Sequence, residues 1–187
     1  MLKTQWIKKR IAYTGEELRS LYAYLEHGVL GNSAIAFRGP CEVTPTHMVD
    51  GEDLLAGSKI AGSDMVHFII EAFDQPLFAG VLLQRLLASL VIDSMEHLAH
   101  KSLDLRREGD DVYWGNRKAS ISIASRSPNS VMIHFAVNVS RKGTPVATCS
   151  LEDFGISPQL FAKDVLRRLS QEWTTVIEAT QKVRAVP

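Results

Sequence analysis

Apolar residues recur along the chain at two spacings, every second residue in some segments and every third or fourth in others. The first spacing predicts strands at residues 5–13, 33–37, 65–73, 110–125 and 130–139. The second predicts helices between residues 14 and 28, at 76–100 and at 157–183. The elements do not alternate strictly, and the hairpin at 110–125 leads directly into the next strand. We therefore expect one α+β domain over residues 1–187, with a mixed, largely antiparallel sheet packed against helices.

Two helices carry local start or stop signals. Thr14 and Glu17 form a capping box, and Gly28 supplies a left-handed stop. The last helix begins at Ser157 and Pro158. We assign the apolar faces of these two helices to the core, namely Leu18, Leu21, Tyr22 and Leu25, and Phe161, Val165, Leu166, Leu169, Trp173, Val176 and Ile177.

The strand at 65–73 is apolar on both faces but includes His67 and Glu71. Burying an unpaired polar group costs about 1–3 kcal/mol, so both residues need partners if this strand is central. Two interpretations stay open. Either they line a cavity, or His67 is a satisfied core histidine and Glu71 lies near an exposed strand end.

The hairpin around Gly115 and Asn116 places several polar side chains on one face. Glycine at the first loop position suits a type II′ turn, which pairs Tyr113 with Lys118 and Asp111 with Ser120. Because side chains alternate along a strand, the residues sharing the polar face are Asp111, Tyr113, Lys118, Ser120 and Ser122. This face is either a ligand site or a half-exposed surface with a cross-strand ion pair.

Composition narrows the function classes. Lys plus Arg and Asp plus Glu both total 21, so the formal net charge is zero and we expect no DNA partner. Two cysteines, Cys41 and Cys149, indicate a reducing cytoplasm, and the absence of CxxC and HExxH motifs indicates no zinc site. No apolar run approaches the length of a membrane span, so we expect a soluble cytoplasmic protein with no membrane partner.

Two loops carry candidate chemistry. Arg38 and Gly39 follow the strand at 33–37, where the arginine either binds a carboxylate or phosphate or pairs with an acidic side chain. Asp50, Glu52 and Asp53 either open a short helix or form a metal site, although their spacing is not that of a calcium loop.

The hairpin also carries a family resemblance. The run Asp110-Asp111-Val112-Tyr113 followed by Gly115-Asn116-Arg117-Lys118 resembles the asparagine-aspartate hairpin of biotin protein ligases and lipoate ligases. Segments 131–139 and 150–155 resemble the strand and the loop that follow it in those enzymes. With the helix before the hairpin, the resemblance covers roughly the C-terminal 60% of the chain as an ordered series of short matches.

The whole chain further resembles a prokaryotic family known only as domain of unknown function 366. The residues that suggest it are Tyr13-Thr14-Gly15-Glu16, Ala36-Phe37-Arg38-Gly39-Pro40-Cys41, Met48-Val49-Asp50 and Gly109-Asp110-Asp111.

These resemblances imply a biotin/lipoate ligase-like fold in which Lys118 is catalytic. Lipoyl-type octanoyltransferases share that fold and use a lysine with a cysteine, which implies that Cys149 is the nucleophile. The remaining candidate substrate-binding residues are Arg38, Gly39, His67, Asp111, Ser120 and Asn138.

Two function classes follow. The first is an acyl-transfer or carboxylate-activating enzyme, and the second is a binding module for a small-molecule carboxylate or acyl ligand. The short turn Arg38-Gly39-Pro40-Cys41 stands where the ligases carry a glycine- and arginine-rich phosphate loop, so we expect weak or absent ATP binding. An RNA-related accessory role is disfavoured by the neutral charge. The sequence identifies no cofactor and leaves a homodimer open.

Overall fold

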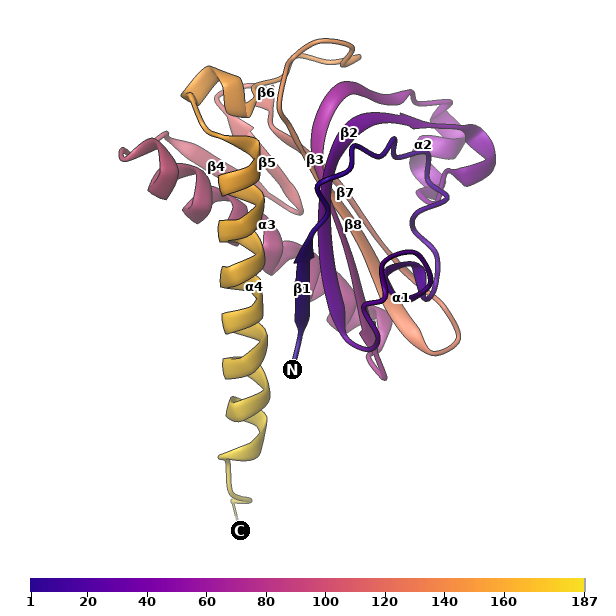
Figure 1. Ribbon diagram of the computed structural model, residues 1–187, viewed down its shortest axis with the longest axis vertical. Helices are drawn as coiled ribbons and strands as arrows, with labels where there is room; N and C mark the ends of the chain where they lie inside the picture. The colour runs from indigo at the N-terminus through magenta and orange to yellow at the C-terminus, as the bar shows by residue number, and fades with distance from the viewer. Residues whose placement is uncertain (187) are drawn as a thin grey trace.

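The computed structural model describes residues 1–186 and has a five-stranded sheet with two long helices on one face (Figure 1). The strands of this sheet are β1 (Lys3–Trp6), β2 (Ser33–Val43), β3 (Ile60–Phe73), β7 (Ser120–Arg126) and β8 (Ser130–Asn138). They lie in the order β1-β2-β3-β8-β7, and only the β1–β2 pair is parallel. The predicted α+β class with a mixed, largely antiparallel sheet is confirmed.

A second, three-stranded sheet and the helices complete the chain. The small sheet consists of β4 (Leu105–Glu108), β5 (Asp111–Trp114) and β6 (Arg117–Lys118). The helices are α1 (Tyr22–His27), α2 (Gly51–Ala56), α3 (Leu77–Ala99) and α4 (Pro158–Gln181), with single 3₁₀ turns η1 (Pro45–His47) and η2 (Leu151–Phe154). The sequence predicted α3 and α4 to within two residues at each end.

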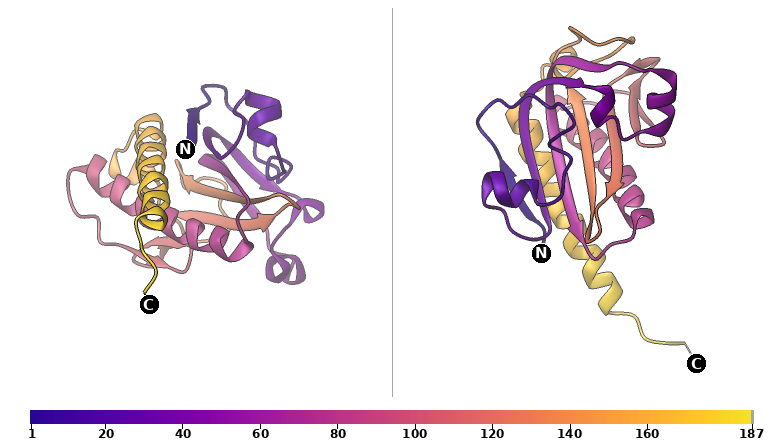
Figure 2. Two further views of the ribbon diagram at one scale, coloured as in Figure 1. Left: turned by 90° about the horizontal axis from the view of Figure 1, so that it is seen from below. Right: turned by 90° about the vertical axis from the view of Figure 1, so that its right-hand side faces the viewer.

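The two faces of the large sheet are covered differently. Helices α3 and α4 lie against one face, and the N-terminal segment with α1 lies against the other (Figures 1 and 2). Phe68 and Phe135 point toward the helices, where they pack with Phe161 of α4. Ile35 and Phe37 point the other way. The side chains of the candidate site described below lie on this second face and at the end of the sheet beside the hairpin.

Glu71 is buried in the core, whereas the sequence predicted that it either lines a cavity or lies near an exposed strand end. It is 4% exposed and accepts hydrogen bonds from the backbone N–H of Leu21 and from the hydroxyls of Ser20 and Ser130. The carboxylate therefore ties the N-terminal segment to the sheet.

The first helix is shorter than predicted, again because of the contact between Leu21 and Glu71. Glu17 accepts from the Thr14 N–H as a capping box requires, but α1 begins only at Tyr22. Leu21, whose N–H bonds Glu71, adopts a left-handed conformation with φ 64° and interrupts the helix. Consequently Leu25 is 66% exposed, and its assignment to the core is wrong.

The first strand and the end of the last helix also depart from prediction. β1 ends at Trp6, and beyond it the chain follows β2 irregularly through isolated backbone hydrogen bonds at Ile11 and Tyr13. Helix α4 extends past the end of the sheet (Figure 2), so Val176 and Ile177 are 50% and 38% exposed and lie outside the core.

Helix α3 corrects the expectation that no segment reaches membrane-span length. An 18-residue window within its 23 residues has a mean hydropathy of 1.6, sufficient by length and composition alone to cross a membrane. Its residues Leu87, Val91 and Met95 are fully buried against the sheet. Through these residues α3 packs as a core helix of the α+β fold, and 39% of its apolar window is buried.

Candidate functional site

The β5–β6 hairpin forms one wall of a cavity of about 380 Å³ at the end of the large sheet. The other walls come from the start of β3, from β7 and β8, and from the loop before η2. Charged and polar side chains that line this cavity, here called the Lys118 cavity, are Asp50, Asp53, Ser58, Lys59, Asp110, Asp111, Lys118, Ser120, Ser122, Asn138, Thr144 and Thr148.

The hairpin turn forms as the sequence predicted, but the strand after it does not. Gly115 has φ 56° while Asn116 keeps a negative φ, and Tyr113 pairs with Lys118. Asp111, however, pairs with Glu108 of β4 and not with Ser120. After Lys118 the chain leaves the small sheet and joins β8 from Ser120 onward. It stays bonded to β5 at Val112, whose carbonyl accepts from the Ala119 N–H at 2.7 Å and whose N–H donates to the Ser120 hydroxyl at 2.9 Å.

Lys118 and Asp111 form an ion pair at the cavity wall. The Lys118 Nζ lies 2.7 Å from Asp111 Oδ2, and the two side chains are 28% and 23% exposed. Burial raises the pKa of the Asp111 carboxyl, which the neighbouring ammonium opposes. The contact fixes the ammonium in place while occupying only one of its three N–H donors.

Asp110 is anchored from the helix layer. Gln84 of α3 is 5% exposed, and its Nε2 donates to Asp110 Oδ2 and to the Ser122 hydroxyl, both at 2.8 Å. Ser122 in turn donates to Asp110 at 2.6 Å. Gln84 was not among the residues predicted from the sequence, although a glutamine within a buried helical run needs a polar partner.

Asn138 connects the hairpin to the loop before η2. It is 4% exposed, and its Nδ2 donates to the carbonyls of Lys118 at 3.2 Å and Cys149 at 3.1 Å. Its Oδ1 has no hydrogen-bond partner among residues 1–186. Asn138 therefore positions the backbone of Lys118 and presents one acceptor to the cavity.

Cys149 lies beside the hairpin backbone but does not line the Lys118 cavity. Its N–H donates to the Lys118 carbonyl at 3.1 Å, and its thiol, buried at the edge of the apolar core, lies 3.6 Å from the Arg117 carbonyl. Burial raises the pKa of this thiol to about 11, so it is protonated at neutral pH. The structure argues against Cys149 as the nucleophile of an acyl transfer into the cavity.

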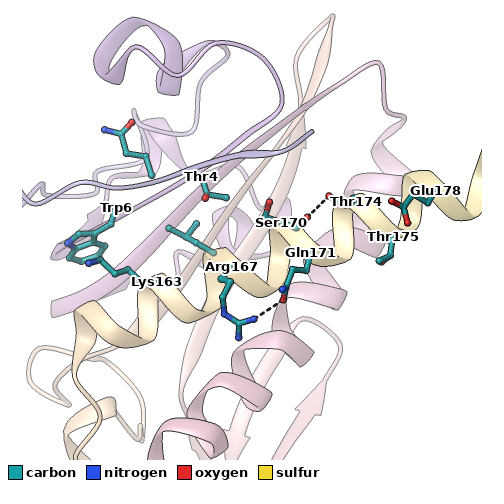
Figure 3. Close-up of a pocket in the computed structure, with 11 residues that line it drawn as sticks. Thr4, Trp6, Lys163, Arg167, Ser170, Gln171, Thr174, Thr175 and Glu178 are labelled. Carbon is teal, nitrogen blue, oxygen red and sulfur yellow. Dashed lines mark hydrogen bonds between the residues drawn. The ribbon is translucent and has the colours of Figure 1, made fainter.

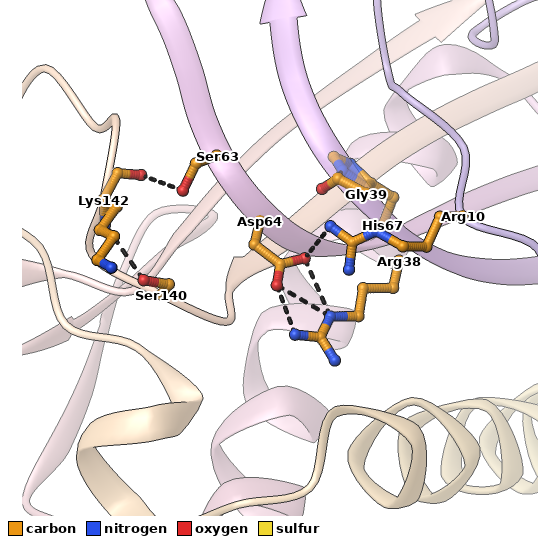
Figure 4. Close-up of polar contacts among 8 residues, drawn as sticks. All are labelled: Arg10, Arg38, Gly39, Ser63, Asp64, His67, Ser140 and Lys142. Atoms are coloured by element: carbon orange, nitrogen blue, oxygen red, sulfur yellow. Dashed lines mark hydrogen bonds and ion pairs between the residues drawn. The ribbon is translucent and has the colours of Figure 1, made fainter.

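Arg38 is separated from the Lys118 cavity and is already paired (Figure 4). Its Nε donates to both carboxylate oxygens of Asp64 at 3.0 Å, and Arg10 donates to the same carboxylate at 3.0 Å. Burial alone would raise the pKa of Asp64, but the two guanidinium groups lower it below its usual value. The sequence left two interpretations of Arg38 open, and the structure shows the one in which it pairs with an acidic side chain.

Gly39 and His67 serve the packing of the fold. A Cβ at Gly39 would overlap the backbone carbonyl of Ile11, so glycine is required where the N-terminal segment crosses β2. His67 is fully buried, with Nε2 3.2 Å from the Gly39 carbonyl oxygen and Nδ1 3.0 Å from Nε2 of His134. Neither residue lines the Lys118 cavity.

The cavity also contains residues that sequence analysis did not select. Lys59 lines it from the segment before β3, and Thr148 lines it opposite Lys118, with which it forms an isolated β-bridge. Asp50 caps α2 by accepting from the N–H groups of Glu52 and Asp53, which accounts for this acidic cluster. Within residues 1–186, no group of three or more His, Cys, Asp or Glu side chains is arranged to hold a metal ion.

A larger concave region, of about 820 Å³, lies between β1 and α4 (Figure 3). Some of its polar side chains already have partners within the protein: Arg167 donates to Gln171 at 2.7 Å, and Ser170 donates to the Leu2 carbonyl at 3.3 Å. None of the residues selected from the sequence lines it. The Lys118 cavity is the better candidate site because an ion pair and several hydrogen-bonding groups converge there.

Solved structures of ligases share this fold. The biotin protein ligase of Aquifex aeolicus has a TM-score of 0.62 at 17% identity, covering 95% of this chain and 72% of that one. The biotin complex of the Leishmania major biotin protein ligase has a TM-score of 0.59 at 15% identity, with 99% and 85% covered. Plasmodium falciparum LipL1 with lipoate has a TM-score of 0.59 at 9% identity, with 100% and 63% covered. The protein therefore has the fold of biotin and lipoate ligase catalytic domains.

Within that fold, the chain belongs to the family described as Domain of unknown function (DUF366), which matches residues 2–184. A protein of unknown function from Pyrococcus horikoshi has a TM-score of 0.94 at 39% identity, with both chains fully covered. An uncharacterised protein of Methanocaldococcus jannaschii is 33% identical over 156 residues, which are 81% of this chain and 70% of that protein. Both resemblances drawn from the sequence are confirmed.

Proposed function

We propose that the Lys118 cavity binds a small-molecule carboxylate or acyl ligand without adenylating it. The observation that carries this proposal is that two lysines, Lys118 and Lys59, line one cavity. Asp111 holds Lys118 in place, and Lys59 has no carboxylate within ion-pair distance in the part of the chain described. A carboxylate between them would accept charge-assisted hydrogen bonds from both ammonium groups.

The alternative is an adenylating ligase or an acyltransferase. It is favoured by the hairpin lysine beside Asp111, in a fold that biotin and lipoate ligases share. Two observations weigh against it. Arg38 is already paired with Asp64, and the Cys149 thiol is buried.

Replacing Lys118 with methionine tests the proposal, because this change removes the ammonium but keeps most of the side-chain volume. Calorimetry and thermal shift would measure binding of octanoate, lipoate and biotin to the wild type and to the Lys118→Met variant. We expect at least one carboxylate to bind, and its affinity to fall about 10- to 100-fold in the variant, the effect of losing a charged hydrogen bond.

The matched control is Lys163→Met, which removes an exposed lysine of α4 outside this cavity and should leave affinity unchanged. Binding that is unaffected by Lys118→Met, or the failure of every carboxylate to bind, would overturn the proposal.

The proposal includes a cytoplasmic location and no DNA partner, in keeping with two free thiols and a formal net charge of zero. It requires no homodimer, because a single chain supplies all the walls described above.

A further inference from the structure

A second, much narrower cavity of about 50 Å³ adjoins the Lys118 cavity, and we call it the histidine slot. Five residues line both cavities, namely Asp50, Asp53, Ile60, Ile121 and Ser122, and His134 lines only the slot. Strand β7 connects them, because Ser120 lies at the Lys118 cavity and Ile123 lies opposite His134 in the sheet register. Three strand residues span about 10 Å, so one extended ligand can reach both cavities.

Hydrogen bonds fix which ring nitrogens carry protons. The Gly39 carbonyl can only accept, so His67 Nε2 carries a proton and donates to it at 3.2 Å. In a neutral ring, His67 Nδ1 is then an acceptor, and it must receive its hydrogen bond from His134 Nε2 at 3.0 Å. Tyr13 stacks on the His134 ring with the centroids 3.5 Å apart, which holds the plane of that ring.

Both rings are neutral at physiological pH. Burial lowers the pKa of His67 to about 4, and burial together with His67 lowers the pKa of His134 well below its usual value. With its proton on Nε2, His134 has a bare lone pair on Nδ1. This nitrogen has no protein donor in residues 1–186, although His134 is only 3% exposed and lines the slot.

We infer that the histidine slot selects a ligand whose end remote from the carboxylate carries an N–H or O–H donor, whose hydrogen bond His134 Nδ1 accepts. This inference rests on the proposed function, because it takes Lys118 as the partner of the carboxylate end. The slot holds only a few heavy atoms, since one water occupies about 30 Å³. Its apolar walls include Val43, Ile121 and Ile123, and the carboxylates of Asp50 and Asp53 also line it. A bare methyl group in the slot would leave the buried acceptor unpaired.

Matched ligands test the inference. Calorimetry would compare straight-chain carboxylates of increasing length with their ω-hydroxy counterparts, which differ only by a terminal O–H donor. We expect a length at which the hydroxy acid binds about tenfold more tightly, the effect of one buried hydrogen bond. His134→Phe should abolish this preference, and His97→Phe, at an exposed position on α3, should preserve it.

The outcomes separate this inference from the proposed function. If both ligand series bind through Lys118 with equal affinity at every length, the inference is overturned and the proposed function stands. If neither series binds, the proposed function fails as well.

A second measurement needs no variant. Nitrogen NMR of protein labelled with ¹⁵N-histidine should show protonated Nε2 and bare Nδ1 on both buried rings at pH 7. Adding the preferred hydroxy acid should shift Nδ1 of His134, and adding the parent acid at equal occupancy should shift it less. A proton on His134 Nδ1 in the free protein would refute the inference whether or not His134→Phe folds.

Discussion

Replacing Asn138 with alanine should destabilise the fold and loosen the candidate site together. The side chain is 4% exposed and donates to two backbone carbonyls, those of Lys118 and Cys149. The Lys118 carbonyl keeps a second bond from the Cys149 N–H, whereas no other donor to the Cys149 carbonyl lies in the described structure. The Cys149 carbonyl is then left without a donor and the Lys118 carbonyl loses one of two, so the free energy of unfolding should fall by about 2–3 kcal/mol. In a domain of this size, that is a fall in Tm of about 4–12 °C.

Urea denaturation followed by circular dichroism measures this loss. Asn129→Ala is the matched control, because Asn129 is exposed and its side chain makes no hydrogen bond in the structure described. Asn138→Asp keeps the shape but turns a carboxylate oxygen toward the carbonyls, so it should be at least as unstable at pH 7. Burial would raise the pKa of that new carboxyl, so the variant should recover stability as the pH falls through it. Equal and small losses in Asn138→Ala and Asn129→Ala would refute the reasoning.

Three further predictions follow from the same contacts. Calorimetry with ATP and magnesium should detect no tight binding, and tight binding that disappears on replacing Arg38 would restore the adenylating-ligase interpretation. Cys149 and Cys41 should react slowly with a thiol reagent in the folded protein, because both are buried and their thiol pKa values are raised to about 11 and about 12; mass spectrometry against the unfolded chain measures this. Asp64→Asn should cost about 1–2 kcal/mol at pH 7. Since the folded pKa of Asp64 is lowered, the gap to the wild type should close as the pH falls from about 4 through that pKa, and urea unfolding from pH 7 to pH 2 measures it.

The sequence predicted the elements whose signals are local. The limits of α3 and α4 follow from their own helical spacing and from a proline at the start of each, with Pro76 as the N-cap of α3 and Pro158 in the first turn of α4. The first helix was mispredicted because its start depends on Glu71, a residue about 50 positions further along the chain. No pattern within residues 14–28 contains that contact.

The candidate site likewise contains residues that a local pattern could place and residues that it could not. Alternation along the hairpin brings Asp111 and Lys118 together at one cavity, whereas Ser120 reaches the same cavity from β7 and not through the predicted pairing with Asp111. Cys149 joins the hairpin backbone beside Lys118, but the sequence does not tell which way its side chain points from there, and the thiol does not line the cavity. The roles of Gln84, which bonds to Asp110, and of Lys59, which lines the cavity, depend on contacts with distant parts of the chain that no local pattern contains.

The change of sheet after Lys118 explains why this lysine is the best-placed cation in the cavity. Its N–H donates to the Ala147 carbonyl at 3.0 Å, and its carbonyl accepts from Cys149 and Asn138. The backbone is thus held from both sides at the point where the chain passes from the small sheet to the large one, and Asp111 holds the side chain. A ligand that binds such a cation loses little free energy to ordering it, whereas the exposed Lys59 must be ordered on binding. The hairpin therefore favours recognition of a carboxylate by its geometry, independently of any phosphate-binding loop.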